Sequence, residues 1–266
     1  AVANGTAAID IAVDALGIGP GDEVIMPTFT IISCVMQIAR SGATPVVVDA
    51  DASMNMDVDK IAGLITPKTK AILVVHLYHF AADMAPILDL AEKHNLYVIE
   101  DAAEMIGQTY KGKRCGSFGT VSTMSFYPNK HITTGEGGMV LTDDPQLYER
   151  IAARRNLCFG PPRRFVHSEF GWNYRMTNMQ AAVGCAQLAY IDKSIARKRE
   201  IGRLYTRLLE GVNGLHLPPD ELGGERNIYW VYGIVLDESV SVDAEVIQKK
   251  LGEKKIGTRP FFWCMH

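Results

Sequence analysis

The chain has 266 residues, of which 47% are hydrophobic and 21% are charged, so it can bury one large domain and part of a second. A net charge of -3 provides no basic field for a polyanion, and we expect no nucleic-acid partner. The longest apolar stretch, AILVVHLYHFAA, is shorter than the ~20 residues that a membrane helix needs. We therefore expect a globular protein with no membrane partner.

Residues 1 to about 145 alternate between helical and strand patterns. AIDIAVDAL and DMAPILDLAEKHN predict amphipathic helices, whereas TPVVVDA, KAILVVHLY and LYVIEDAA predict short buried strands. This alternation is typical of an α/β fold with a mixed, mostly parallel sheet flanked by helices. Such sheets bind ligands at the carboxyl ends of their strands, where His76, Asp49 and Asp101 fall.

The second half of the chain has a different pattern. TDDPQLYERIAARRNL predicts a helix, an irregular segment follows, and a long amphipathic stretch runs from about Met179 to Leu209. NIYWVYGIVL predicts a strand and DAEVIQKKLGEKKIGTRP a helix, which together suggest a smaller α+β unit that ends before its core is complete. We expect a large domain over residues 1–192 and an incomplete C-terminal domain over residues 193–266.

The cysteines and signal features indicate the compartment. Five cysteines are widely spread and form no C-x-x-C pair, which argues against a disulfide framework and against a thiolate zinc site. The chain does not open with the charged and apolar regions of a signal peptide. We therefore expect a cytoplasmic protein.

Other metal sites are also disfavoured. Residues 49–60 superficially resemble a calcium loop, but Met54 stands in place of the required glycine and Lys60 in place of the bidentate glutamate. His76 and His79 are three positions apart on an apolar strand pattern and would point to opposite faces, so we expect hydrogen-bonded strand-end histidines. The sequence predicts no metal site.

Three motifs together suggest a cofactor. Lys130, in SFYPNKHITTGEGG, follows a strand-like run; most lysines are solvated surface charges, so alone it says little. Asn4-Gly5-Thr6 directly precedes the first predicted helix, where backbone amides and the helix dipole suit a phosphate. Asp101 ends a buried strand, where an isolated carboxylate is costly unless it meets a cation. A lysine, a phosphate cradle and a buried aspartate are what pyridoxal phosphate requires.

An ordered series of segments extends this pattern over the whole chain. NGTAA, GPGDEVIMPTFT, GATPVVVD, ITPKTKAILVVHLY, VIEDAAE, SFYPNKHITTGEGGMVLTDD and WNYRMTNMQAA resemble, in this order, the sugar aminotransferases of the DegT/DnrJ/EryC1/StrS family. The resemblance implies a pyridoxal-phosphate-dependent transferase of fold type I. It also implies pyridoxal 5'-phosphate as the cofactor and a homodimer with active sites shared between the subunits.

The resemblance assigns roles around the cofactor ring. Lys130 matches the Schiff-base lysine and Asp101 the partner of the pyridinium nitrogen. Ala103 matches the small residue against one face of the ring, and Glu104 stands near the cofactor's 3-oxygen, where many members have Gln. Ile31 occupies the place where the family usually has a stacking aromatic residue, so stacking must be replaced by aliphatic contact or come from elsewhere.

Further positions match the family's phosphate contacts. Gly5, Thr6 and Ser125 match contacts made within one subunit, and Asn173 matches a contact donated by the other subunit. Without the resemblance, Ser125 could equally be a strand hydroxyl and Asn173 a turn residue. Relatives also carry a leading segment before NGT and further elements after the last residues, so those pieces are expected to be disordered or truncated.

Within the family, the segment after Lys130 resembles enzymes that aminate C4 of a nucleotide-linked 4-keto-6-deoxy sugar. RRFVHSEFGWNYRMTN and GTRPFFWCMH resemble members that act on GDP-4-keto-6-deoxymannose, so the resemblance implies this sugar as acceptor and L-glutamate as amino donor. The alternatives are a C3 aminotransferase, a dehydratase that uses the same cofactor, and a non-catalytic binding or regulatory member. Lys130 argues against the dehydratase, in which a histidine replaces the lysine, although His131 is adjacent.

Overall fold

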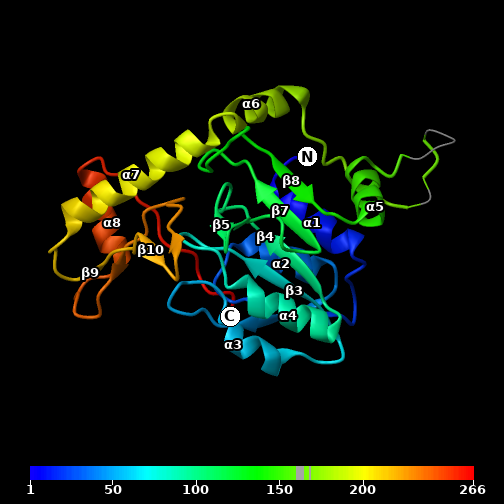
Figure 1. Cartoon of the computed structure of the whole chain (residues 1–266), viewed down its shortest axis with the longest axis horizontal. Helices are drawn as coiled ribbons and strands as arrows, with labels where there is room; N and C mark the ends of the chain where they lie inside the picture. Colours follow the sequence, from blue (N-terminus) through cyan, green and yellow to red (C-terminus); the bar gives the residue numbers. More distant parts are fainter. Residues whose placement is uncertain (160–164, 168) are drawn as a thin grey trace.

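The computed structural model describes residues 1–159, 165–167 and 169–266, and its centre is one mixed sheet (Figure 1). In spatial order its strands are β2 (Thr44–Val48), β1 (Glu23–Pro27), β3 (Thr69–Val75), β4 (Tyr97–Asp101), β7 (Val121–Ser125) and β8 (Gly138–Leu141). Neighbouring strands from β2 to β7 in this order are parallel, and β8 is antiparallel to β7. The predicted mostly parallel sheet is therefore confirmed.

Helices cover both faces of this sheet. One buried cluster joins α1 and α2 to the side chains of Met26, Leu73 and Ile99. A second cluster joins α4 to Ile72 and Val98, which alternate with the first set along the strands and point to the opposite face. The helices before residue 160 are α1 (Gly5–Ala15), α2 (Ile32–Arg40), α3 (Val58–Ile61), the 3-10 turn η1 (Ala62–Leu64), α4 (Met84–His94) and α5 (Pro145–Arg155).

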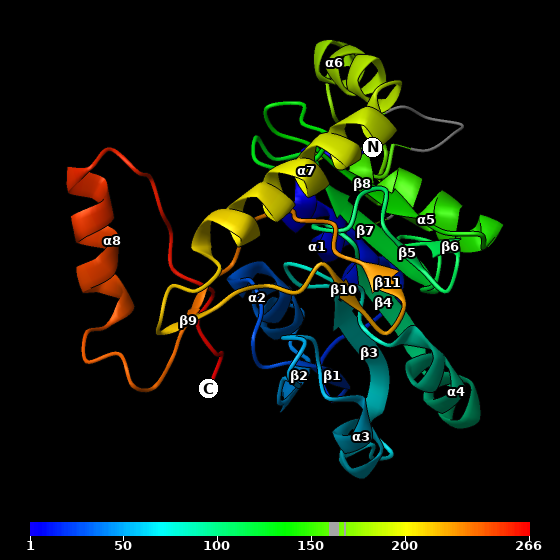
Figure 2. The same ribbon diagram turned by 60° about the vertical axis from the view of Figure 1, so that its left-hand side comes forward.

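The later part of the chain extends away from the sheet. The predicted amphipathic stretch forms two helices, α6 (Asn178–Leu188) and α7 (Ile191–Leu209), and α8 (Ala244–Glu253) lies beyond α7, far from the sheet in both ribbon views (Figures 1 and 2). The small two-stranded sheets pair β5 (Thr109–Tyr110) with β6 (Lys113–Arg114), β10 (Glu221–Leu222) with β11 (Glu225–Arg226), and β9 (Leu215–His216) with β12 (Val235–Leu236).

Two expectations about strands were wrong. TPVVVDA forms β2, but this strand lies at the edge of the sheet and is mostly exposed or half-buried because it has a neighbour on one side only. NIYWVYGIVL forms a strand only at its end, in β12. Tyr229 adopts a positive φ of 48°, which breaks an extended strand, while Ile228 and Trp230 are buried in the core of the large sheet.

The predicted domain boundary after residue 192 falls near the beginning of α7. Ile195 on that helix, Ile228 and Trp230 all belong to the buried cluster of α1 and α2. The segment around Trp230 therefore packs into the large unit, and the division at residue 192 stays a prediction.

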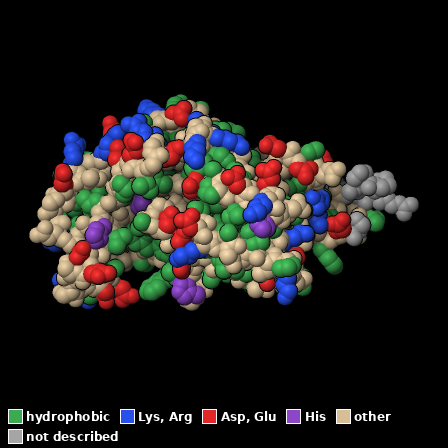
Figure 3. Space-filling view, turned by 60° about the horizontal axis from the view of Figure 1, so that its bottom comes forward, with side chains coloured by type: hydrophobic (Ala, Val, Ile, Leu, Met, Phe, Trp, Pro, Cys, Tyr) green, Lys and Arg blue, Asp and Glu red, His purple; other side chains and the backbone are tan. Residues whose placement is uncertain are grey.

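The distribution of surface charge and the character of the helices relate to the expectation of no nucleic-acid and no membrane partner. Acidic and basic side chains are interspersed over the face shown in Figure 3, with hydrophobic side chains between them. Among the described residues, no helix combines the length and apolar character needed to cross a bilayer.

Candidate active site

The N-terminus of α1 lies against the end of β7. Asn4 caps the helix, and its side-chain Oδ1 accepts a hydrogen bond of 2.8 Å from the N–H of Ala7. A Cβ added at Gly5 would lie 2.8 Å from the Cβ of Ser125, so only glycine allows this close approach. The first-turn amides of Gly5 and Thr6 have no acceptor within the helix and can therefore donate to an anion. Gly5 also lies beside the Ser125 side chain, whose hydroxyl offers a further donor.

Asp101 is the last residue of β4 and is buried on the α1 and α2 face of the sheet. Its Oδ1 accepts hydrogen bonds from the N–H of Ala103 at 3.0 Å and from the hydroxyl of Thr123 at 3.3 Å. The thiol of Cys34 donates to Oδ2 at 3.5 Å. These three donors hold the carboxylate from β7, α2 and its own strand end.

Lys130 lies in the loop between β7 and β8. Its backbone N–H donates to the carbonyl of Tyr127 at 3.0 Å, and its side chain is only 9% exposed. The amine Nζ lies 3.9 Å from Oε1 of Glu104 and 3.9 Å from the centre of the Trp230 ring. The ammonium form is therefore attracted by a carboxylate and by the indole face.

The charges of this site are strongly perturbed by burial. Burial raises the pKa of Asp101, although the Ala103 amide and the Lys130 charge oppose this shift. Burial also raises the pKa of Glu104, against the attraction of Lys130. In the opposite direction, burial lowers the pKa of the Lys130 amine, against the attraction of Glu104 and then Asp101. Such opposed shifts in one cluster are typical of functional sites.

The structure brings together most of the residues predicted to form the site. Lys130, Glu104 and Asp101 interact electrostatically. Ala103 contacts the Asp101 carboxylate through its amide. Ser125 follows Thr123 by two positions on β7, so both point to the face of Asp101.

Two other predicted residues lie at the surface. Ile31 directly precedes α2, and its side chain is 37% exposed. Asn173 is exposed and forms an isolated antiparallel bridge with Asn156. Exposure of Asn173 is compatible with a contact to another subunit, which stays a prediction. Residues 160–164 and 168, in the irregular segment before Asn173, lie outside the described residues.

The other residues that the sequence placed at strand ends make different contacts in the structure. Asp49 forms an exposed ion pair with Lys60 at 3.0 Å, away from the site. His76 is hydrogen-bonded as expected: the Ala82 N–H donates to its Nδ1 at 3.1 Å, so the proton on Nε2 is donated to Glu100 at 3.0 Å. The ring nitrogens of His79 are buried beyond normal hydrogen-bond geometry from the described residues, although the Asn227 side chain is near enough to oppose the lowering of its pKa by burial. Its hydrogen bonding stays a prediction.

Three residues of the site were not identified from the sequence. Cys34 lies 67 positions before Asp101 in the chain, Thr123 lies 22 positions after it, and Trp230 lies 129 positions after it. Cys34 is fully buried, and the Nε1–H of Trp230 donates to the carbonyl of Asn129, beside Lys130, at 3.2 Å. Only Thr123 carried a signal, since it precedes Ser125 by two residues on one predicted strand.

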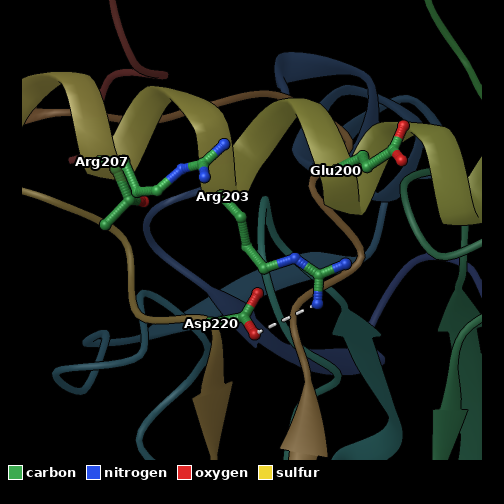
Figure 4. Close-up of a pocket in the computed structure, with 5 residues that line it drawn as sticks. Glu200, Arg203, Arg207 and Asp220 are labelled. Carbon is green, nitrogen blue, oxygen red and sulfur yellow. Dashed lines mark ion pairs between the residues drawn. The ribbon is translucent and has the colours of Figure 1, made fainter.

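Two further clusters lie elsewhere in the described part of the chain. Buried His76, Glu100 and Cys115 have possible ligand atoms within 4.8 Å of one another, but Glu100 already accepts hydrogen bonds from several donors. An exposed hollow on α7 is lined by Glu200, Thr206 and Arg207, with Arg203 reaching to within 3.9 Å of Asp220 (Figure 4). None of the predicted site residues lines this hollow.

The residues present fit pyridoxal phosphate. The close approach of Gly5 to Ser125 forms a cradle that a Cβ would fill, with backbone donors suited to a phosphate. Asp101 is a buried carboxylate whose Oδ2 accepts only the weak thiol donor among the described hydrogen bonds. Lys130 supplies a buried amine that lies 3.9 Å from Glu104 and is attracted by the charge of Asp101.

The comparisons identify the family. A family model described as the DegT/DnrJ/EryC1/StrS aminotransferase family matches residues 1–266. The chain belongs to this family. The predictions of an aminotransferase and of its fold type I architecture are thereby confirmed.

Individual relatives are similar over the whole chain. GDP-perosamine synthase of Caulobacter vibrioides is 46% identical over 265 residues, which cover 99% of this chain and 71% of that protein. GDP-perosamine synthase of Escherichia coli O157:H7 is 45% identical over 266 residues, which cover 100% and 72%. The crystal structure of the aminotransferase TlmJ from Streptoalloteichus hindustanus has a TM-score of 0.92 and 30% identity, covering 100% of this chain and 72% of that one.

Proposed function

We propose that this chain transfers an amino group from L-glutamate to C4 of a nucleotide-linked 4-keto-6-deoxy sugar, with pyridoxal 5'-phosphate as cofactor. GDP-4-keto-6-deoxymannose is the proposed acceptor and GDP-perosamine the product. The observation that carries the proposal is the buried Lys130 amine beside two buried carboxylates, in a chain of the aminotransferase family. The acceptor sugar is supported by the two GDP-perosamine synthases that match the chain from end to end.

Each part of the site has a separate task in this proposal. The α1 amides of Gly5 and Thr6 bind the phosphate together with the Ser125 hydroxyl. The Asp101 carboxylate balances the positive charge of a protonated pyridine nitrogen, and the ring supplies an electron sink for the chemistry at the substrate carbon. Lys130 would hold the cofactor through Nζ, and as a free amine it would move a proton on and off the substrate carbon.

Side chains around Lys130 also control its position and surroundings. Trp230 covers the amine with its indole face, and its Nε1–H anchors the ring to the backbone of the Lys130 loop. Tyr78 stacks on Trp230 with ring centres 5.8 Å apart, and its backbone N–H donates to Glu104 at 2.7 Å. These contacts shield one side of the Lys130 amine from water.

The proposed assembly is a homodimer in which Asn173 of one subunit contacts the phosphate held by the other. Its exposure and its position before α6 support this role. Asn173→Ala would then bind the cofactor less tightly while a mixed dimer with Lys130→Ala regains activity at one of its two sites. Equal cofactor affinity in the Asn173 variant and the unchanged protein would contradict the contact.

The direct test combines a spectrum with a substrate panel. Purified protein reconstituted with pyridoxal phosphate is expected to show the absorbance of lysine-bound cofactor, and L-glutamate is expected to remove that band. The amino product is then sought with GDP- and dTDP-linked 4-keto and 3-keto sugars. No change of the band with glutamate would favour the binding or regulatory alternative, and amination of a 3-keto sugar alone would favour the C3 aminotransferase.

A further inference from the structure

Glu104 and Lys130 form a buried pair of opposite charges. Their side chains are 6% and 9% exposed, and Oε1 of Glu104 lies 3.9 Å from Nζ of Lys130. The other carboxylate oxygen, Oε2, accepts the N–H of Tyr78 at 2.7 Å. This backbone contact fixes the carboxyl group, so that Oε1 is the oxygen directed at the amine.

A second pair in the chain has the same distance but a different environment. Nζ of Lys111 also lies 3.9 Å from a carboxylate oxygen, Oδ1 of Asp83, but these side chains are 68% and 55% exposed. The pKa of Lys111 is raised, mainly by the hydroxyl of Tyr110. The pKa of Lys130 is lowered by burial although two carboxylates surround it. The difference between the two lysines therefore arises from desolvation and not from the length of the ion pair.

Desolvation acts on both members of the buried pair in the same sense. It disfavours the ammonium of Lys130 and the carboxylate of Glu104, and so it favours the state in which the proton lies on the carboxyl group. The ammonium is in turn favoured by the face of Trp230 and by the charge of Asp101. Desolvation therefore reduces the free-energy difference between the charged and neutral forms of the pair, while the indole face and Asp101 oppose it.

We propose that Glu104 is the internal proton acceptor for Lys130. Rotation of the Lys130 side chain shortens the 3.9 Å between Nζ and Oε1 to hydrogen-bond distance, and the proton then moves from Nζ to Oε1. The transfer leaves a neutral carboxyl group on Glu104 and a lone pair on the Lys130 nitrogen, which is free to attack an aldehyde carbon. No electrons are exchanged, and the same proton returns to Nζ when the lysine is released. The inference rests on the proposed function only in making Lys130 the nucleophile.

The other titratable groups near Lys130 are less suited than Glu104 to accept its proton. Asp101, from β4, already accepts hydrogen bonds from Ala103, Thr123 and Cys34. His131, directly after Lys130, has its Nε2 at 3.3 Å from the carbonyl of Ile228, and burial lowers its pKa to about 4. Burial raises the pKa of the Cys34 thiol and of the Tyr78 hydroxyl, so both stay protonated at neutral pH.

Internal transfer has a specific pH signature. While the pair holds one proton in total, the fraction of neutral amine is set inside the pair and does not change with pH. The reactivity of a lysine that exchanges its proton with solvent instead increases about tenfold for each unit that the pH rises, as long as the pH is below its pKa. The reactivity of Lys130 is therefore expected to form a plateau around neutral pH, whereas that of Lys111 rises steadily.

The experiment uses the full chain freed of cofactor. Trace acetic anhydride is added between pH 5 and 9, and acetylation of Lys130 and Lys111 is measured by peptide mass spectrometry in the same samples. In the unchanged protein, the acetylation rate of Lys130 is expected to vary less than about threefold over two pH units around neutrality. In Glu104→Gln, the acetylation rate of Lys130 is expected to increase about 100-fold as the pH rises through the two units below the lysine's half-titration. The pH dependence of Lys111 acetylation is expected to be the same as in the unchanged protein.

A second variant separates the two carboxylates. Asp101→Asn is expected to keep the plateau, since Glu104 is still present, and melting temperatures establish that each variant is folded. A tenfold rise per pH unit in the unchanged protein, or a plateau that survives in Glu104→Gln and disappears in Asp101→Asn, would overturn the proposal. Because the readout needs neither cofactor nor sugar, a wrong acceptor sugar or an inactive protein would leave its result intact.

Discussion

Glu100 and Asp101 are consecutive buried carboxylates on β4, and they point to opposite faces of the sheet. Glu100 accepts five hydrogen bonds, from the ring of His76, the hydroxyl of Ser122 and three backbone amides. Burial alone would raise the pKa of Glu100, but the hydrogen bonds from His76 and from the Gly116 and Phe118 amides lower it to about 2. The pKa of Asp101 is raised instead, since fewer and weaker donors oppose its burial.

The difference distinguishes a structural carboxylate from one prepared for a ligand. The partners of Glu100 all come from the chain itself, and they tie β3, β4 and β7 together beneath α4. The partners of Asp101 leave room for a cation to lower the free energy of its charged form. Neighbouring carboxylates on one strand can therefore serve stability on one face of the sheet and chemistry on the other.

The largest effect is expected from the functional face, in Lys130→Ala. The variant should lose the absorbance of covalently bound cofactor and at least about 10⁴-fold in turnover, because no other amine replaces Nζ. Its melting temperature should remain close to that of the unchanged protein, as Glu104 can take up a proton when its partner is absent. Lys111→Ala, which removes the exposed pair of equal distance, is the control. Measurable turnover in Lys130→Ala would remove the lysine from the mechanism.

Asp101→Asn tests the charge on the same face. The amide keeps the size of the side chain but cannot stabilise a protonated ring nitrogen, so cofactor should still bind through Lys130 while the reaction with glutamate slows. A loss of about 100-fold corresponds to ~3 kcal/mol in the transition state. Stopped-flow absorbance of the glutamate half-reaction measures it. An unchanged rate would make Asp101 as structural as its neighbour Glu100.

Glu100→Gln is expected to act on stability instead. Its amide would replace one carboxylate oxygen by an NH2 group, which would face either the N–H of Gly116 or the N–H groups of Phe118 and Gly119 and leave them unpaired. We expect a loss of about 3 kcal/mol in the free energy of unfolding, measured by urea denaturation. Cofactor absorbance at low temperature should be retained. Loss of cofactor binding without loss of stability would reverse the roles assigned to the two faces.

Acid titration sharpens the same contrast. The pKa of Glu100 falls from 4.5 in the unfolded chain to about 2 in the folded one, so its stabilisation is complete above pH 4.5 and is lost as the pH falls toward 2. A shift of this size corresponds to roughly 3 kcal/mol. The raised pKa of Glu104 has the opposite sign, and in cofactor-free protein it lowers stability as the pH rises above 4.5. The free energy of unfolding is measured against pH for both variants. Glu100→Gln should lack the loss of stability as the pH falls toward 2, and Glu104→Gln should lack the loss of stability above pH 4.5.

The sequence predicted the functional face better than the structural one. Lys130, Asp101 and Gly5 stand in short motifs at strand and helix ends, where the local chain determines which way a side chain points. The five donors to Glu100 could not be foreseen, since most of them come from a loop whose path depends on packing under β4. Trp230 was missed for a related reason: its segment was assigned to a strand, but burial in the large core outweighed strand propensity.

The smallest effect is expected from Cys34, which adjusts the functional face. Its thiol is fully buried and donates to Oδ2 of Asp101 at 3.5 Å, favouring the charged form of the carboxylate. Cys34→Ala removes this donor, and a net hydrogen bond of about 1 kcal/mol corresponds to roughly a fivefold loss in cofactor affinity. Cys34→Ser retains a hydroxyl donor of similar size and should restore most of that affinity, measured by fluorescence titration with pyridoxal phosphate. If serine binds the cofactor as weakly as alanine, the thiol only fills space beneath Asp101, and that carboxylate is held by Ala103 and Thr123 alone.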